Sequence, residues 1–115
     1  MQRKVNQIRP HEIAMARDQG EEILIVDVRE PFEYHGELGH VPGSLNIPMQ
    51  QIPENLHIFR NAKGNVALIC HTGERSHYTC LFLLDQGITN VMNVDGGMVK
   101  WHLSGLDVEY SPEFG

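Results

Sequence analysis

The strongest structural signal in the chain is the stretch Val66-Ala-Leu-Ile-Cys70-His-Thr-Gly73-Glu-Arg75-Ser-His77. A short aliphatic run, typical of a strand, ends in Cys70, and a turn containing Gly73 follows it. The residues after the turn predict a helix over 75–86, ended by Gly87. A thiol at the carboxyl end of a strand then faces the amino terminus of the next helix, which is where an α/β protein usually places its chemistry.

Outward from this stretch, apolar runs alternate with helical patterns along the chain. The patterns predict strands over 5–8, 23–28, 44–47, 66–69 and 88–94 and helices over 10–19, 31–35, 50–59, 75–86 and 98–103. The run over 23–28 is continuously apolar rather than alternating, which favours a strand covered on both faces. We therefore expect a single α/β domain over 1–115 with a mainly parallel sheet, a core over about 5–108 and a tail over 109–115.

Composition restricts the class of function. Apolar residues make up 41% and charged residues 21% of the 115 residues, which argues against disorder. The net charge of −6 argues against a general binder of nucleic acid or of membrane surfaces, because both need a basic face. No apolar segment follows the basic pair Arg3-Lys4, so we expect no signal peptide, a cytoplasmic protein, and reduced thiols at Cys70 and Cys80.

The loop after Cys70 has the residues of an anion cradle. A cysteine reacts as its thiolate, which backbone N–H groups of a curled loop and the positive end of a helix stabilise. Gly73 permits a positive φ, and we expect Arg75 to fold back over the loop as a fixed positive charge. Lowering a thiol pKa by about two units accelerates its attack only about threefold, because nucleophilicity falls too. The loop is therefore expected to bind an anionic group as well, although a buried structural Cys70 with a surface Arg75 is the simpler alternative.

Four motifs, in order and spacing, resemble those of the single-domain rhodaneses. They are Asp27-Val-Arg-Glu-Pro-Phe-Glu-Tyr34, Gly39-His-Val-Pro-Gly-Ser-Leu-Asn-Ile-Pro48, Cys70-His-Thr-Gly-Glu-Arg-Ser76 and Gly96-Gly-Met-Val-Lys-Trp101. The resemblance covers the chain from about Val5 to Val108. It implies a rhodanese-like, five-stranded mainly parallel sheet flanked by helices. It also implies a sulfurtransferase without metal or organic cofactor, in which Cys70 carries a persulfide held by the backbone amides of the loop His71, Thr72, Gly73, Glu74 and Arg75.

The resemblance implies small sulfur donors and acceptors as partners: thiosulfate or a persulfide as donor, and cyanide, a thiol or a protein thiol as acceptor. Related phosphatases and arsenate reductases use a loop one residue longer, whereas Cys70 to Arg75 spans six residues. The shorter loop favours a pocket for a single sulfur atom over one for a tetrahedral anion. A rhodanese fold kept for partner binding or sulfide signalling is the non-enzymatic alternative.

Further residues are candidates for the rim of the pocket. Asp27 and Arg29 follow a strand that ends at the same sheet edge as Cys70, and Asp95 and Gly96 follow another. A structural Asp–Arg–Glu pairing explains the first two equally well. Glu33 is expected to be a salt-bridge partner.

The remaining polar residues give weaker signals. Cys80 lies on the predicted helix, where a buried small side chain is the default and a resolving thiol the sharper alternative. The seven histidines show no ligand spacing, so no metal site is predicted. Thiosulfate-preferring rhodaneses tend to have basic loop residues, whereas this loop has Thr72 and Glu74. On a chain of net charge −6, thiosulfate is therefore expected to be a poor donor, with a thiol persulfide or a protein as the physiological one.

Overall fold

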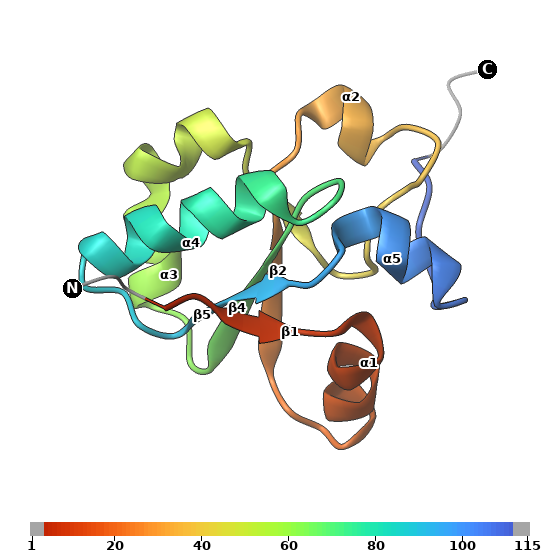
Figure 1. Cartoon of the computed structure of the whole chain (residues 1–115), viewed down its shortest axis with the longest axis horizontal. Coiled ribbons are helices and arrows are strands. Elements are labelled where there is room, and N and C mark those ends of the chain that lie inside the picture. The colour runs from red at the N-terminus through yellow and green to blue at the C-terminus, as the bar shows by residue number, and fades with distance from the viewer. Residues whose placement is uncertain (1–3, 112–115) are drawn as a thin grey trace.

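A computed structural model describes residues 4–111, in which helices pack on both faces of a parallel sheet (Figure 1). The five strands lie in the order β1-β5-β4-β2-β3, and every pairing is parallel. The strands are β1 (Asn6–Ile8), β2 (Ile23–Asp27), β3 (Leu45–Asn46), β4 (Asn65–Ile69) and β5 (Val91–Val94). The predicted five-stranded sheet is confirmed. Residues 112–115 of the predicted tail lie outside the described residues.

The helices are α1 (Pro10–Asp18), α2 (Pro31–Tyr34), the 3-10 helix η1 (Met49–Asn55), α3 (Leu56–Arg60), α4 (Glu74–Asp85) and α5 (Gly97–Leu103). The prediction of one helix over 50–59 is wrong, because the segment divides into η1 and α3. Pro53 lies inside η1 and has no N–H to donate to an α-helical hydrogen bond. Across residues 4–111, the helices are too short or too polar for a membrane span.

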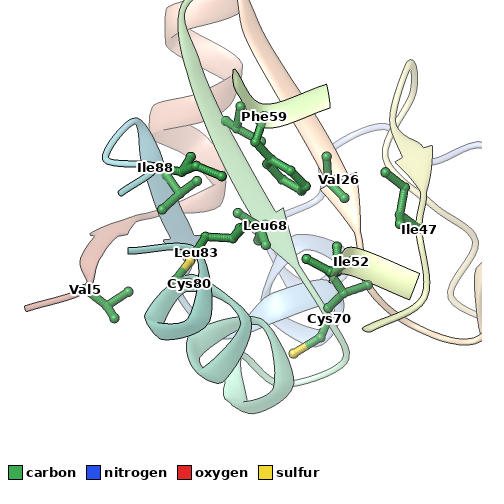
Figure 2. Close-up of a cluster of buried hydrophobic side chains, with 13 residues drawn as sticks. Val5, Val26, Ile47, Ile52, Phe59, Leu68, Cys70, Cys80, Leu83 and Ile88 are labelled. Atoms are coloured by element: carbon green, nitrogen blue, oxygen red, sulfur yellow. The ribbon is translucent and has the colours of Figure 1, made fainter. Parts of the chain in front are cut away.

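The core consists of two clusters, one on each face of the sheet. Side chains of β4 and of Cys70 directly after it alternate between the two clusters. Val66, Leu68 and Cys70 belong to the cluster beneath α3 and α4 (Figure 2), and Ala67 and Ile69 belong to the cluster beneath α1 and α5. All five are at most 1% exposed. The continuous apolar run before Cys70 therefore makes a strand that is covered on both faces, which fixes the position of the loop after it.

The loop after β4 lies at a reversal in the direction of the chain connections. The connection from β2 leads through α2 to β3 at one side, whereas the connection from β4 leads through α4 to β5 at the other. The carboxyl ends of β2 and β4 are neighbours, with Asp27 opposite Ile69. Such a reversal leaves a crevice at the carboxyl ends of parallel strands, and open α/β proteins bind ligands there.

Candidate active site

Cys70 lies directly after β4, beside α4, and its residue is 1% exposed (Figure 2). The backbone N–H of Gly73 donates a hydrogen bond to the Cys70 sulfur at 3.1 Å. The Ser76 hydroxyl oxygen lies 3.2 Å from the same sulfur. The sulfur is thus held between the loop and the first turn of α4, as expected for a thiol aimed at a helix amino terminus.

Gly73 has the backbone conformation that the curl requires. Its φ is +101°, in the left-handed region, and it forms the N-cap of α4. A Cβ atom at this position would lie 3.3 Å from the Gly96 nitrogen. The conformation and the close neighbour both favour glycine, so the predicted positive φ is confirmed.

The amino terminus of α5 holds the outer side of the loop. The N–H groups of Met98 and Val99 donate to the carbonyls of Cys70 and His71 at 2.8 and 3.1 Å. A Cβ atom on Gly97 would lie 2.5 Å from the Cys70 carbonyl oxygen, so only glycine permits this approach. Sequence analysis missed this support, and the pair Gly96-Gly97 after a strand was its signal.

Arg75 donates the hydrogen bonds of its guanidinium to Glu33. Two nitrogens of its guanidinium donate to the two carboxylate oxygens of Glu33 at 2.7 and 2.8 Å. The hydrogen bond from Arg75 lowers the pKa of Glu33 to about 2, and the same bond raises the pKa of Arg75. The Glu33 carboxylate thus accepts hydrogen bonds from both terminal nitrogens of the Arg75 guanidinium, and the pair joins α4 to α2. The prediction that Glu33 forms a salt bridge is confirmed.

Asp27 and Arg29 support the site from inside and do not form its rim. They are 0% and 2% exposed. Arg29 donates to Asp27 at 2.8 Å and to the backbone carbonyls of Glu33 and Gly39 at 3.2 and 2.8 Å. The Asp–Arg part of the structural alternative is therefore observed, whereas Arg29 reaches Glu33 only at its backbone carbonyl and so ties the end of β2 to the segment that carries Glu33.

Asp95 and Gly96, the two residues after β5 that were predicted to form the rim, lie in different surroundings. Asp95 turns to solvent, where its carboxylate accepts a hydrogen bond from Lys100 at 2.9 Å and its side chain is 49% exposed. Gly96 lies against Gly73, so it borders the loop. A shallow depression of about 380 Å³ opens next to the loop and is lined by Thr72, Gly73, Glu74, His77 and Tyr78.

A buried polar chain behind Cys70 was missed by sequence analysis. The hydroxyl of Ser76 lies 2.5 Å from the side-chain oxygen of Asn93 on β5. The Asn93 amide nitrogen donates to the carbonyl of Gly73 at 3.0 Å and to the side-chain oxygen of Gln7 at 3.1 Å. The position of Ser76 directly after Arg75 was the available signal, whereas Asn93 is one polar residue in an apolar strand.

Cys80 is fully buried in α4, in the cluster that also contains Cys70 (Figure 2). Burial raises its pKa to about 12, with a smaller contribution from Cys70. The predicted buried side chain is confirmed. Within residues 4–111, no group of three His, Cys, Asp or Glu side chains could hold a metal ion.

Known proteins resemble this chain along most of its length. The family model of the rhodanese-like domain matches residues 10–104. A sulfurtransferase of Allochromatium vinosum is 32% identical over 104 residues, which are 90% of this chain and 94% of that protein. Thiosulfate sulfurtransferase GlpE of Pseudomonas fluorescens is 28% identical over 94 residues, 82% of each chain.

The fold agrees with these matches. The crystal structure of a rhodanese-like domain protein from Staphylococcus aureus superposes with a TM-score of 0.78 at 32% identity, covering 91% of this chain and 99% of that one. The match to the family model spans strands β2 to β5 and includes the loop from Cys70 to Arg75, whereas β1 precedes it. This chain therefore belongs to the rhodanese-like domain family.

Proposed function

We propose that this chain is a sulfurtransferase that carries a sulfane sulfur as a persulfide on Cys70. The observation that carries the proposal is the Gly73 N–H aimed at the Cys70 sulfur from 3.1 Å, at the carboxyl edge of a parallel sheet. A donor at this position stabilises negative charge on sulfur. Relatives named sulfurtransferase and thiosulfate sulfurtransferase support the same chemistry.

The proposed reaction has two half-reactions. The Cys70 thiolate attacks the outer sulfur of thiosulfate, the S–S bond of the donor breaks, and sulfite leaves with the bonding electron pair. Cys70 then carries a terminal persulfide anion. An acceptor thiolate or cyanide attacks the terminal sulfur, the Cys70–S bond breaks, and the Cys70 thiolate returns while a persulfide or thiocyanate leaves.

The nature of the donor follows from the charges at the mouth. Glu74 is exposed at the start of α4, and Arg75 is neutralised by Glu33. Since Glu33 already occupies the guanidinium of Arg75, a divalent anion gains little from that side chain. We propose that thiosulfate is a usable but poor donor and that a thiol persulfide or a protein persulfide is the physiological one. A reducing compartment such as the cytoplasm keeps both cysteines as the free thiols that this reaction needs.

Intact-protein mass spectrometry after incubation with thiosulfate, and separately with glutathione persulfide, tests the proposal. We expect a mass increase of one sulfur atom that is absent in Cys70→Ser and kept in Cys80→Ala. The added sulfur should disappear when cyanide is supplied, with thiocyanate formed in equal amount. If neither donor gives an adduct, the proposal is overturned. Hydrolysis of p-nitrophenyl phosphate that depends on Cys70 would also overturn it.

A further inference from the structure

The amide of Asn93 has a fixed orientation behind the active-site loop. Asn93 is 4% exposed on β5. One side of its amide faces the backbone carbonyl of Gly73, at 3.0 Å, and a carbonyl oxygen can only accept a hydrogen bond. The amide nitrogen must therefore point at Gly73, and it also donates to Gln7 on the neighbouring strand, at 3.1 Å. The side-chain oxygen of Asn93 is left facing α4 as an acceptor.

The Ser76 hydroxyl has one proton and two neighbours. The Asn93 oxygen lies at 2.5 Å, within the range of an O–H···O hydrogen bond, and the Cys70 sulfur lies at 3.2 Å. Because the Asn93 oxygen has no proton to give, Ser76 must donate to it. The Ser76 oxygen then presents only its lone pairs to the Cys70 sulfur, so it can accept a hydrogen bond from the sulfur but cannot donate one.

This arrangement suits a neutral thiol at Cys70. The thiol can donate its S–H to the Ser76 oxygen while it accepts the N–H of Gly73 at 3.1 Å. A thiolate has no proton, so the lone pairs of Ser76 would face a negative sulfur. Once the thiol has released its proton to solvent, the hydroxyl must rotate, break its bond to Asn93 and donate to the sulfur.

We propose that Asn93 is a positioning residue that competes with the Cys70 sulfur for the single proton of Ser76. Asn93 holds the proton of the Ser76 hydroxyl away from the sulfur in the resting thiol, and the hydroxyl must be released from Asn93 when the thiolate forms. The neutral thiol is thereby favoured over the thiolate. The inference rests on the proposed role of Cys70 as nucleophile, but its test measures the thiol directly and does not need sulfur transfer.

The test is the pH dependence of alkylation of Cys70 by iodoacetamide in a double-mutant cycle. In Asn93→Leu the freed hydroxyl donates to the thiolate, so the pH midpoint should fall by about one unit, the size expected of a hydrogen bond to a charged group. Ser76→Ala should raise the midpoint because the thiolate loses its donor. In the Ser76→Ala background, Asn93→Leu should no longer lower the midpoint.

Asn90→Leu is the matched control. Asn90 donates to the Gly64 carbonyl at 2.9 Å, at the opposite end of the sheet, so the same substitution costs a similar hydrogen bond but should leave the midpoint unchanged. Asn93→Ala removes the same acceptor with a smaller side chain and should also lower the midpoint, which provides a second variant if Asn93→Leu folds poorly. An equal fall with and without the Ser76 hydroxyl would overturn the proposal, since the change would then come from the loop backbone. Failure of sulfur loading in the wild type would overturn the proposed function and leave this result standing.

Discussion

At the scale of single residues, Gly73 sets the direction of the loop. Its φ of +101° costs other residues about 1–2 kcal/mol, and an added Cβ would press on the Gly96 nitrogen. We expect Gly73→Ala to lose about 1–2 kcal/mol of unfolding free energy. We also expect it to lose most of its sulfur loading, because the N–H that points at the Cys70 sulfur moves with the backbone. Urea unfolding and mass spectrometry of the loaded protein measure the two effects.

Gly87 offers a matched control for this change. It has a φ of +80° but no atom within 4 Å of an added Cβ, and it follows the far end of α4. Gly87→Ala should therefore show a similar loss of stability with normal loading. If both variants load equally well, the backbone direction at Gly73 does not control the sulfur.

Cys80 is the second residue whose chemistry is decided by its surroundings. Since burial raises its pKa to about 12, only about one molecule in ten thousand has the thiolate at about pH 8. We expect iodoacetamide to modify the native wild-type protein once, at Cys70, and Cys80→Ala to accept sulfur at the wild-type rate. Peptide mapping after alkylation checks the first outcome. A second alkylation at a comparable rate would show that Cys80 is accessible for a sulfur relay.

At the scale of secondary-structure elements, the Arg75–Glu33 pair joins α4 to α2. The pKa of Glu33 is about 2 in the folded chain against an ordinary 4.5. A lowered carboxyl pKa adds stability that is complete above the unfolded value and is lost as the pH falls toward the folded value. The Glu33 side chain is 23% exposed and the Arg75 side chain 38%. Solvent screening therefore limits the contribution of the pair to the free energy of unfolding to about 1 kcal/mol.

We therefore expect Glu33→Gln to lower the free energy of unfolding by about 1 kcal/mol at about pH 7. The difference from wild type should shrink as the pH falls from about 5 to about 3, because the unfolded wild-type chain takes up a proton at Glu33 in this range while the folded chain keeps the carboxylate charged. Urea unfolding across that range measures it. Glu37→Gln, at an exposed position just after α2, is the control and should change stability little at any pH. A difference that stays constant with pH would mean that the charge of Glu33 is not what stabilises the contact.

At the scale of the whole molecule, features that depend on local sequence patterns could be predicted, whereas features that depend on contacts between distant residues could not. The order of strands and helices was predictable because each apolar run has its own turn signals, and the place of Cys70 follows from the strand before it. The hydrogen-bonded series Gln7–Asn93–Ser76 could not be predicted, because it requires β1 to lie beside β5. This pairing brings together Gln7 and Asn93, which are 86 positions apart in the sequence. The same holds for the α5 amides on the loop and for Arg75 as the partner of Glu33. Such contacts depend on topology, which single-sequence patterns do not specify.

Net charge is the other property of the whole molecule that bears on function. The chain has 15 acidic and 9 basic residues, giving −6, and the exposed Glu74 adds a negative charge beside the depression next to the loop. An anionic donor approaching this face meets repulsion that acts over about 10 Å at moderate salt. The repulsion weakens as salt is added, whereas a neutral alkylating reagent such as iodoacetamide should be insensitive to salt.

We expect Glu74→Gln to raise kcat/KM for thiosulfate about two- to threefold at low ionic strength, with little gain at about 1 M salt. Glu22→Gln changes the net charge equally, but Glu22 lies just before β2 at the opposite edge of the sheet from Cys70 and should have a much smaller effect. Steady-state assays with thiosulfate and cyanide at low and high salt separate local from global charge. An equal gain in both variants would assign the repulsion to the net charge of the chain. No gain in either would mean that electrostatic repulsion does not limit thiosulfate, and the preference for a persulfide donor would lose its physical basis.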